Sequence, residues 1–337
     1  MIFKKYNSVE NSFDEEFVAR VRGQMPRDLQ YVVQEKVHGA NASFLCDGTN
    51  IVFAKRTAVI ERDEAFYGYE EMVNTYRNNI LALTKDVMEL YPGTVQVNIF
   101  GELFGGCYPH PDVESVKNVK LVQKGIYYCP GHEFYGFDIY IQSDEEGHFL
   151  PVIDTNALFE KHGFFYARTL FSGKLEECLS HPNAFITHIP EWLGLPSIED
   201  NICEGIVIRP VIPMYLTTGA RVLIKSKNSR FAEKRARRGP RPILDPTVHY
   251  SEEMKELMSI LETYITEPRL DNVISHIGEV KMPKDFGKLT GMYAKDVFDD
   301  FMKENGVAFD ELERTEQKAL KKELAKLSSR LIQKANI

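Results

Sequence analysis

Apolar residues in the first part of the chain fall in short runs separated by turns, which is the pattern of β-strands. Residues 31–33 form an apolar strand that leads into a glycine-containing turn. Two further strands are predicted at 42–46 and 51–56, on either side of the Asp47-Gly48 turn. We expect this hairpin to bring Arg56 back toward Lys36. More strands are predicted near 95–103, 133–141, 148–152, 167–171, 205–208 and 221–224.

Helical periodicity occurs at two places in the same part of the chain. Between residues 63 and 91, apolar side chains recur at spacings of three and four, and Pro92-Gly93 ends the predicted helix. A short helix is predicted from Asp154, a good N-cap, to Gly163 as its C-terminal stop. Together these elements predict an α+β fold of largely antiparallel sheets with flanking helices.

The pattern changes at the proline-rich segment 239–242, after which strand patterns stop and helical ones take over. Helices are predicted near 252–264, 270–277, 294–304 and 309–332. The last of them carries a stripe of leucines at positions 320, 324, 327 and 331. We therefore predict a larger domain at 1–240 and a small, all-helical C-terminal domain at 241–337.

Composition limits the class of protein. The chain has 337 residues, of which 43% are hydrophobic and 27% charged, as in globular proteins. No apolar run approaches the roughly 20 residues that cross a membrane. Residues 1–6 lack the apolar core of a signal peptide, and five scattered cysteines fit a reducing compartment. We expect a cytoplasmic protein without membrane association, in the host cytoplasm if it is viral.

The charge distribution is uneven. The chain carries a net charge of −8, yet the segment 225–241 holds eight basic residues against one acid, Glu233, and so has a local charge of +7. Clustered lysines and arginines attract phosphate groups. We expect this segment to contact phosphates. Its basic residues are Lys225, Lys227, Arg230, Lys234, Arg235, Arg237, Arg238 and Arg241.

Lys36 is the strongest candidate for covalent chemistry, because a lysine between an apolar strand and a glycine turn can present its amine to a phosphorus or carbonyl centre. A free lysine has a pKa near 10.4, so nearby cations that lower it would help. Lys225, Lys227, Arg56 and a bound Mg²⁺ are the candidates. Lys225 and Lys227 share one face of a predicted strand, as two clamps on a polyphosphate would, and the alternative is a solvated pair.

Two acids and one aromatic residue complete the candidate site. Glu102 ends an apolar strand before a glycine turn, and Glu204 opens a buried strand, where a carboxylate is costly unless it is paired or binds a metal. Such acids accept from ribose hydroxyls or hold Mg²⁺. Phe137, beside Asp138, is positioned to stack on a base. The alternatives are ordinary acids at sheet edges and a core phenylalanine.

A zinc site is a further alternative. The pairs Cys107/His110 and Cys129/His132 have the spacing of ligand pairs in Cys₂His₂ sites. Prolines 109, 111 and 130 make the same stretches fit ordinary proline turns equally well.

Taken together, these residues resemble the ATP-dependent RNA ligase 2 family, which includes bacteriophage RNA ligases and the kinetoplastid RNA-editing ligases. The C-terminal stretches 271–278 and 283–288 resemble the phage enzyme, whereas the loop 105–111 is closer to the editing ligases. Six motifs carry the resemblance in order, at 36–41, 55–57, 100–106, 137–139, 204–210 and 224–228.

The resemblance implies a nucleotidyltransferase fold, an ATP-grasp-like adenylation domain followed by a helical domain. It also implies ATP and Mg²⁺ as cofactors, with Mn²⁺ as a substitute. Three in-line phosphoryl transfers follow from it. Lys36 attacks the α-phosphorus of ATP to form lysyl-AMP, the AMP passes to an RNA 5′-phosphate, and a 3′-OH then displaces it.

Residue roles carried over from the family are assigned by position. Glu35 and Val37 would contact adenine, Phe137 would stack on it, and Glu102 would hold the ribose. Asn41 and Arg56 would face the AMP phosphate or the RNA ends, Lys225 and Lys227 would bind phosphates, and Glu204 would place Mg²⁺. The remaining substrate-facing candidates are His38, Asp138 and Arg230.

The expected substrate is RNA, preferably a nick in duplex RNA, and the protein is expected to be a monomer. His38 stands where DNA ligases and capping enzymes usually have Asp, which favours RNA ligase. An ATP-dependent DNA ligase or a GTP-using capping enzyme remains an alternative. Another is a non-catalytic protein that binds RNA ends through a ligase-like pocket.

Overall fold

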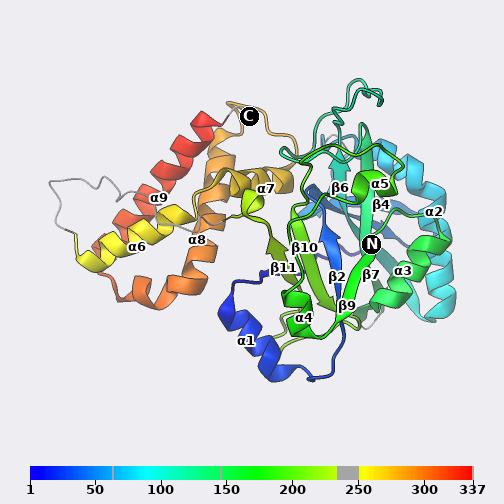
Figure 1. The fold of residues 1–337 in the computed structure, drawn as a ribbon, viewed down its shortest axis with the longest axis horizontal. Helices are drawn as coiled ribbons and strands as arrows, with labels where there is room; N and C mark the ends of the chain where they lie inside the picture. The colour runs from blue at the N-terminus through cyan, green and yellow to red at the C-terminus, as the bar shows by residue number, and fades with distance from the viewer. Residues whose placement is uncertain (63, 145, 234–249, 336–337) are drawn as a thin grey trace. The chain divides into compact units, whose positions relative to one another are not determined.

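A computed structural model describes residues 1–62, 64–144, 146–233 and 250–335. Contacts divide the chain into two units, 1–228 and 229–337, which we call the N-terminal and C-terminal units (Figure 1). The domain boundary predicted at residue 240 lies outside the described residues and stays a prediction. Within the described ranges, none of the helices combines the length and the apolar character needed to span a bilayer.

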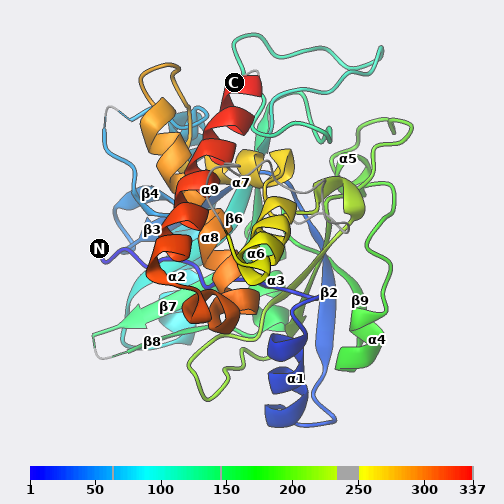
Figure 2. The same cartoon turned by 90° about the vertical axis from the view of Figure 1, so that its left-hand side faces the viewer.

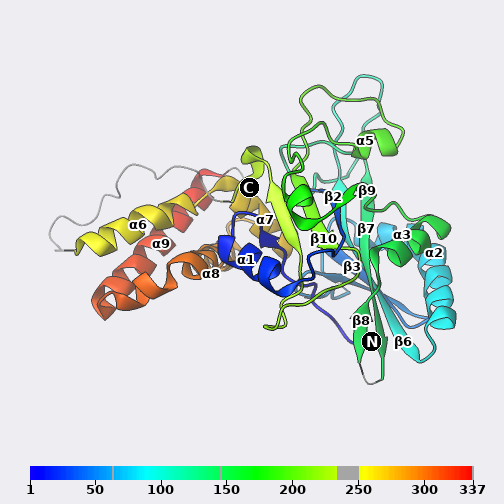
Figure 3. The ribbon, with the colours of Figure 1, turned by 60° about the horizontal axis from the view of Figure 1, so that its bottom comes forward.

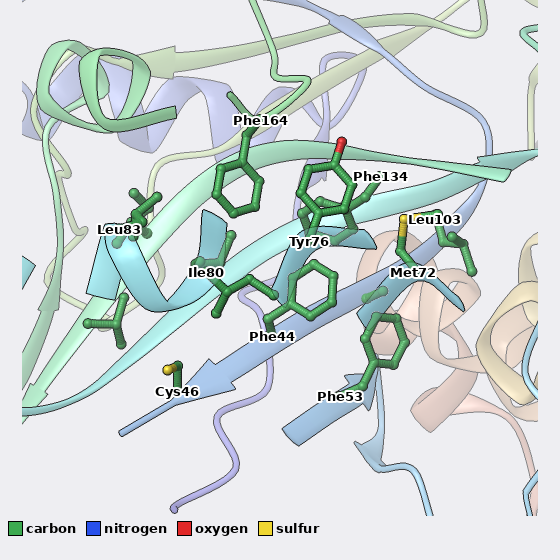
Figure 4. Close-up of a cluster of buried hydrophobic side chains, with 14 of the residues drawn as sticks. Phe44, Cys46, Phe53, Met72, Tyr76, Ile80, Leu83, Leu103, Phe134 and Phe164 are labelled. Atoms are coloured by element: carbon green, nitrogen blue, oxygen red, sulfur yellow. The ribbon is translucent and has the colours of Figure 1, made fainter. Parts of the chain in front are cut away.

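The N-terminal unit contains a six-stranded antiparallel sheet, sheet B, in the order β5-β4-β3-β6-β7-β8. One face of it packs against α2 (Tyr69–Leu90) and α3 (Val152–Lys161) through a core rich in aromatic rings (Figure 4). The rings of Phe44 and Phe134, for example, lie 4.6 Å apart. The strands are β3 (Ala40–Cys46), β4 (Ile51–Lys55), β5 (Ala58–Val59), β6 (Thr94–Gly105), β7 (His132–Ser143) and β8 (Gly147–Phe149).

The other sheet of this unit, sheet A, has five strands in the order β1-β11-β10-β2-β9, and all its pairs are antiparallel except β1 with β11. An apolar cluster that includes Phe17 of α1 (Glu15–Gln24) and Cys178 of α4 (Leu175–Leu179) packs against its β2 and β10. Figure 3 shows α1 beside the strands of this sheet. The strands are β1 (Glu10–Asn11), β2 (Tyr31–Lys36), β9 (Thr169–Gly173), β10 (Gly205–Pro210) and β11 (Ile224–Lys227), and α5 spans Ile189–Trp192.

The C-terminal unit is helical where it is described. Side-chain hydroxyls of Ser251 and Thr266 cap α6 and α7, and the buried Arg269 of α7 pairs with Asp296 at 2.6 Å and Asp300 at 2.9 Å on α8. Figure 2 shows α9 running along α8, with α6 beside it. The elements are η1 (Ser229–Phe231), α6 (Glu252–Thr263), α7 (Glu267–Ile277), α8 (Phe286–Glu311) and α9 (Arg314–Lys334).

The α+β class, the antiparallel sheets and the helical C-terminal region predicted from the sequence are confirmed. Two predicted starts in the N-terminal unit are wrong. Gly68 adopts a left-handed conformation with φ of 64°, and α2 begins only after it, not near residue 63. Asp154 is not an N-cap, because α3 begins at Val152 after Pro151, and the preceding strand ends at Phe149.

Two other predicted boundaries also differ. The last strand begins at Ile224 rather than 221 and continues to Lys227, which places both predicted phosphate clamps on it. In the C-terminal unit, α8 runs unbroken from Phe286 to Glu311 through Gly306, so Phe309 belongs to it and not to the final helix. The packing of Phe301 and Phe309 in one core offsets the cost of a glycine within the helix.

Candidate active site

Lys36 is the last residue of β2, where the chain leaves sheet A. The turn Val37–Gly39 leads directly into β3 of sheet B. A Cβ atom on Gly39 would lie 2.3 Å from the carbonyl oxygen of Leu103, so only glycine lets this turn approach β6 so closely. Lys36 therefore stands at the junction of the two sheets.

Glu204 lies between two lysines at the same end of sheet A. Gly205 pairs with Lys36 on one side and with Lys227 on the other. The Oε2 atom of Glu204 is 2.6 Å from Nζ of Lys36, and Oε1 is 2.8 Å from Nζ of Lys227. Gly205 has φ of 152° and no room for a Cβ, which would lie 2.1 Å from the carbonyl oxygen of Ser226. This close packing of Gly205 against β11 fixes the position of Glu204, the residue before it.

The electrostatics of Glu204 follow from its surroundings. Burial by itself raises the pKa of this carboxyl, but the ammonium groups of Lys227 and Lys36 outweigh burial and lower the pKa to about 2. His38 adds a weaker contribution, with Nδ1 3.7 Å from Oε2. The fully buried carboxylate is thus ionised at neutral pH and holds the side chain of the proposed nucleophile in place.

Sheet B supplies Glu102, Asn41 and Arg56 to the same site. Asn41 and Glu102 are direct partners on β3 and β6, and the Asn41 side chain acts to lower the pKa of Glu102. Burial raises the pKa of Glu102 to about 7, while the charges of Lys36 and Arg56 act in the opposite direction. The influence of Arg56 agrees with the expectation that the 42–56 hairpin returns this residue toward Lys36.

Glu35 is buried on the other side of β2. Its carboxylate accepts hydrogen bonds from the Thr187 hydroxyl at 2.5 Å and from the His188 backbone N–H at 3.0 Å. Burial raises the pKa of Glu35 to about 7, although both hydrogen bonds lower it. Val37 is also buried. Both carboxylate oxygens have partners in the protein, and the adenine contact predicted for Glu35 stays a prediction.

Phe137 and Asp138 lie next to a second cluster of charged and aromatic groups. Phe137 is half-buried, with its ring 5.0 Å from that of Tyr6. The fully buried Asp138 accepts from Tyr6 at 2.8 Å and pairs with Arg221 at 2.7 Å and Arg209 at 3.1 Å. Its predicted contact with substrate also stays a prediction.

Several members of the site are not among the residues predicted from the sequence. Tyr128 accepts a hydrogen bond from the His38 backbone N–H at 2.9 Å and so anchors the turn after Lys36. Arg209, an arginine in an otherwise apolar run, is a signal that could have suggested a buried ion pair. Nothing in the local pattern marks Tyr6, Tyr128 or Thr187.

The remaining candidates are placed as follows. Lys225 is half-buried on β11, two residues from Lys227 and therefore on the same face of that strand. Arg230 is exposed in η1 of the C-terminal unit. The basic residues from Lys234 to Arg241 lie outside the described residues.

Three of the four residues of the alternative zinc site have separate hydrogen-bond partners. The Cys129 thiol bonds to the carbonyl oxygen of Gly131, Nε2 of His132 lies 2.6 Å from the carbonyl oxygen of Lys120, and Nδ1 of His110 accepts from the Asp112 backbone N–H. Among the described residues, no group of three or more His, Cys, Asp or Glu side chains is arranged to hold a metal ion.

Comparison with known proteins gives the class. Residues 29–227, more than half of the chain, match the model of the RNA ligase family, and the chain belongs to that family. All the residues that converge around Glu204 lie within the matched range. Residues 248–330 match a second model, described as the T4 RNA ligase 2 C-terminal family. The two matches in this order make the chain an RNA ligase of the RNA ligase 2 type, as its motifs predicted.

Similar curated proteins agree with this class in name. The chain is 27% identical to RNA-editing ligase 2, mitochondrial, of Trypanosoma brucei brucei, over 90% of its own length and 84% of that protein. It is 28% identical to RNA-editing ligase 1, mitochondrial, over 82% and 70%. Structures of Naegleria gruberi RNA ligase are more distant. One mutant without ligand has 15% identity and a TM-score of 0.42, covering 68% of this chain and 56% of that one.

Proposed function

We propose that this protein seals 3′-OH and 5′-phosphate RNA ends with ATP, through a covalent AMP adduct on Lys36. The observation that carries the proposal is the position of Lys36, whose Nζ atom is held 2.6 Å from a buried carboxylate at the junction of two sheets. The family match supports the reaction class. One solved structure of Naegleria gruberi RNA ligase is of a mutant with ATP and Mn, which is a finding about that protein. We propose ATP for this chain because of the sequence motifs that this chain contains.

The first step forms one bond and breaks another. The deprotonated Lys36 amine attacks the α-phosphorus of ATP, a P–N bond forms, and the P–O bond to pyrophosphate breaks. Lys227, and Lys225 on the same strand face, would bind the phosphates. The AMP then passes to the RNA 5′-phosphate, and the 3′-OH of the neighbouring strand displaces it in the last step.

The other site residues would orient the nucleotide and the RNA ends. We assign Glu102 to the ribose hydroxyls, Asn41 and Arg56 to the AMP phosphate or RNA ends, and Glu35 and Val37 to adenine. Phe137 would stack on the base. His38, Asp138 and Arg230 are the remaining candidates for contact with substrate.

The site also fits a divalent cation. Mg²⁺ in proteins is usually held by one or two carboxylates together with substrate phosphates and water. The charge of Glu204 raises the pKa of Glu102, so these two carboxyl groups are near each other and are the candidates to hold the ion. When bound, Mg²⁺ or Mn²⁺ would neutralise charge that develops on the phosphates.

The test is incubation of the purified protein with α-labelled ATP and Mg²⁺, followed by denaturing electrophoresis, with Lys36→Ala alongside. We expect label on the wild type alone. Absence of label on folded, AMP-free wild-type protein would remove the ligase mechanism and favour a non-catalytic protein that binds RNA ends.

We further propose that nicked duplex RNA is the preferred substrate, that the protein acts as a monomer, and that it works in the cytoplasm. Duplex RNA is recognised through backbone shape and 2′-hydroxyls, which suits a chain whose basic residues are clustered. Faster joining of free single strands than of a nick would contradict the first proposal. Sedimentation and cell fractionation test the other two.

A further inference from the structure

Helix α9 carries an excess of positive charge that the proposed chemistry does not use. Its residues 314–334 include seven basic and two acidic side chains, for a net charge of +5 in a chain of net charge −8. Every one of the seven basic residues is exposed. They are Arg314, Lys318, Lys321, Lys322, Lys326, Arg330 and Lys334.

Six of these residues form one regular row, because they recur at every fourth position from Arg314 to Lys334. The buried residues Leu320, Leu324, Ser328 and Ile332 recur with the same period, two positions out of step. Two positions on an α-helix correspond to about 200°. The basic row therefore lies opposite the buried row at each turn, and both rows wind slowly around the helix, by about 40° per step, over about 30 Å. Figure 2 shows α9 lying along the outside of α8.

The acids of α9 neutralise only one position of this row, Lys326. Glu316 accepts a hydrogen bond from the Ser251 backbone N–H at 2.8 Å, and Glu323, with 18% of its side chain exposed, lies 3.2 Å from Lys326. Like charges four residues apart destabilise a helix. On α8, by contrast, Lys295 has Asp299 at the fourth position and pairs with it. The row on α9 thus weakens its own helix, which is the expected cost of a surface kept for an anionic partner.

We propose that the basic row of α9 binds the phosphodiester backbone of duplex RNA. This inference rests on the proposed RNA-sealing function and assigns it a second contact surface. Phosphate contacts of this kind are independent of sequence and strongly dependent on salt. A continuous row of cations suits a duplex backbone, which presents phosphates at regular intervals.

Other occupants fit the surface less well. Protein interfaces are usually anchored by buried aromatic or aliphatic side chains, and within the described residues 314–334 no large apolar side chain is exposed. A basic helix that lies on a membrane needs a free apolar face to insert. The apolar face of α9, with Leu320 and Ile332 fully buried, is already packed in the core of the C-terminal unit.

The experiment compares two triple variants of the full chain. One removes three charges from the row, Lys318→Gln, Lys322→Gln and Arg330→Gln. The control removes three exposed lysines of α8, Lys288→Gln, Lys295→Gln and Lys303→Gln. Lys321 is left unchanged because its ammonium lies 4.9 Å from the Phe298 ring centre and contributes to packing. Affinity for a labelled RNA duplex with a 3′-OH/5′-phosphate nick is measured at several salt concentrations.

We expect the α9 variant to bind RNA at least about tenfold more weakly at low salt, and its slope of log affinity against log salt to fall by about two to three. The α8 control should change neither quantity by as much. A charge-preserving variant, Lys318→Arg with Lys322→Arg, should bind like the wild type, and melting temperatures check that each variant folds. Equal losses of RNA affinity in both triple variants, or no loss in the α9 variant, would overturn the inference. No loss in the α9 variant is also the result expected if α9 binds an acidic protein instead of RNA.

Lysyl-AMP formation without RNA is measured on the same proteins. It should be the same in all of them, because the row lies outside the N-terminal unit that holds Lys36. If the wild type forms no lysyl-AMP, the proposed function fails, while the binding and salt data still decide whether α9 contacts RNA. The two failures are therefore distinguishable.

Discussion

Lys36 and Glu204 are 168 residues apart in the sequence, and their charged atoms lie 2.6 Å apart. The carboxylate is shared, because Lys227 approaches its other oxygen. One buried carboxylate is therefore the counter-charge for both lysine side chains. The two ammonium groups account for the low pKa of Glu204, whose negative charge in turn stabilises both lysines in the site.

Glu204→Gln should reduce lysyl-AMP formation by about 100-fold and lower the free energy of unfolding by roughly 2–4 kcal/mol, because it leaves two ammonium groups facing each other without a counter-charge. Labelling and chemical denaturation measure the two effects. Glu176→Gln is the matched control. It breaks the exposed pair with Arg22 and should change stability by no more than about 0.5 kcal/mol. Similar losses in both variants would contradict the central role of Glu204.

Lys36→Ala should abolish labelling by ATP but leave some sealing of RNA that already carries a 5′-adenylate, because only the first step needs the amine as nucleophile. The measurement is single-turnover joining of pre-adenylylated RNA, with circular dichroism to verify folding. Complete loss of joining in a folded variant would mean that Lys36 also acts in the later steps.

Glu35→Gln should change how stability depends on pH. The folded pKa of Glu35, about 7, lies above its ordinary value of 4.5, so the folded state binds more protons between these values. The free energy of unfolding of the wild type should then fall as pH rises from about 4.5 to 7. Relative to the wild type, the Gln variant should gain up to about 3 kcal/mol across that window. A constant difference between the two proteins from pH 4.5 to 8 would contradict the raised pKa.

Gly39→Ala should destabilise the N-terminal unit by about 1–3 kcal/mol and reduce lysyl-AMP formation, because the new methyl group would collide with the Leu103 carbonyl. Gly23→Ala serves as the control. Gly23 lies on the exposed side of α1 with nothing within 4 Å of a Cβ, so this change should stabilise the helix by about 0.5–1 kcal/mol. Thermal melting of both variants shows whether the signs are opposite.

Asp138→Asn should cost about 3–5 kcal/mol of stability, since it leaves Arg209 and Arg221 buried without a counter-charge. Tyr6→Phe removes one hydrogen bond from the same group and should cost about 1 kcal/mol. Urea denaturation of the two variants measures both. A smaller loss for Asp138→Asn than for Tyr6→Phe would show that the ion pairs do not stabilise the fold.

Local pattern was enough to predict the hairpin around Asp47-Gly48 and the start of the helical region, because both depend on residues close together in the chain. It could not reveal that Glu204 lies between Lys36 and Lys227. That arrangement depends on β10 pairing with both β2 and β11. The alternation of apolar and polar residues within one strand does not specify which strands it pairs with.

The wrong predictions of helix boundaries have a similar origin. Gly306 suggests a break, yet core contacts of Phe301 and Phe309 carry α8 through it. Asp154 has the chemistry of an N-cap, but Pro151 starts α3 one turn earlier. The network around Asp138 was also invisible, because its members come from positions 6, 138, 209 and 221.

The strand order of the two sheets has a consequence for synthesis on the ribosome. Sheet B is built entirely from strands between residues 40 and 149, so all of its strands are available before sheet A can be completed. Sheet A joins β2 to β10 and β1 to β11, and it is complete only when Lys227 has left the exit tunnel. A nascent chain shorter than that holds Lys36 without its carboxylate partner or the second lysine, and it should be unable to react with ATP until the last strand arrives.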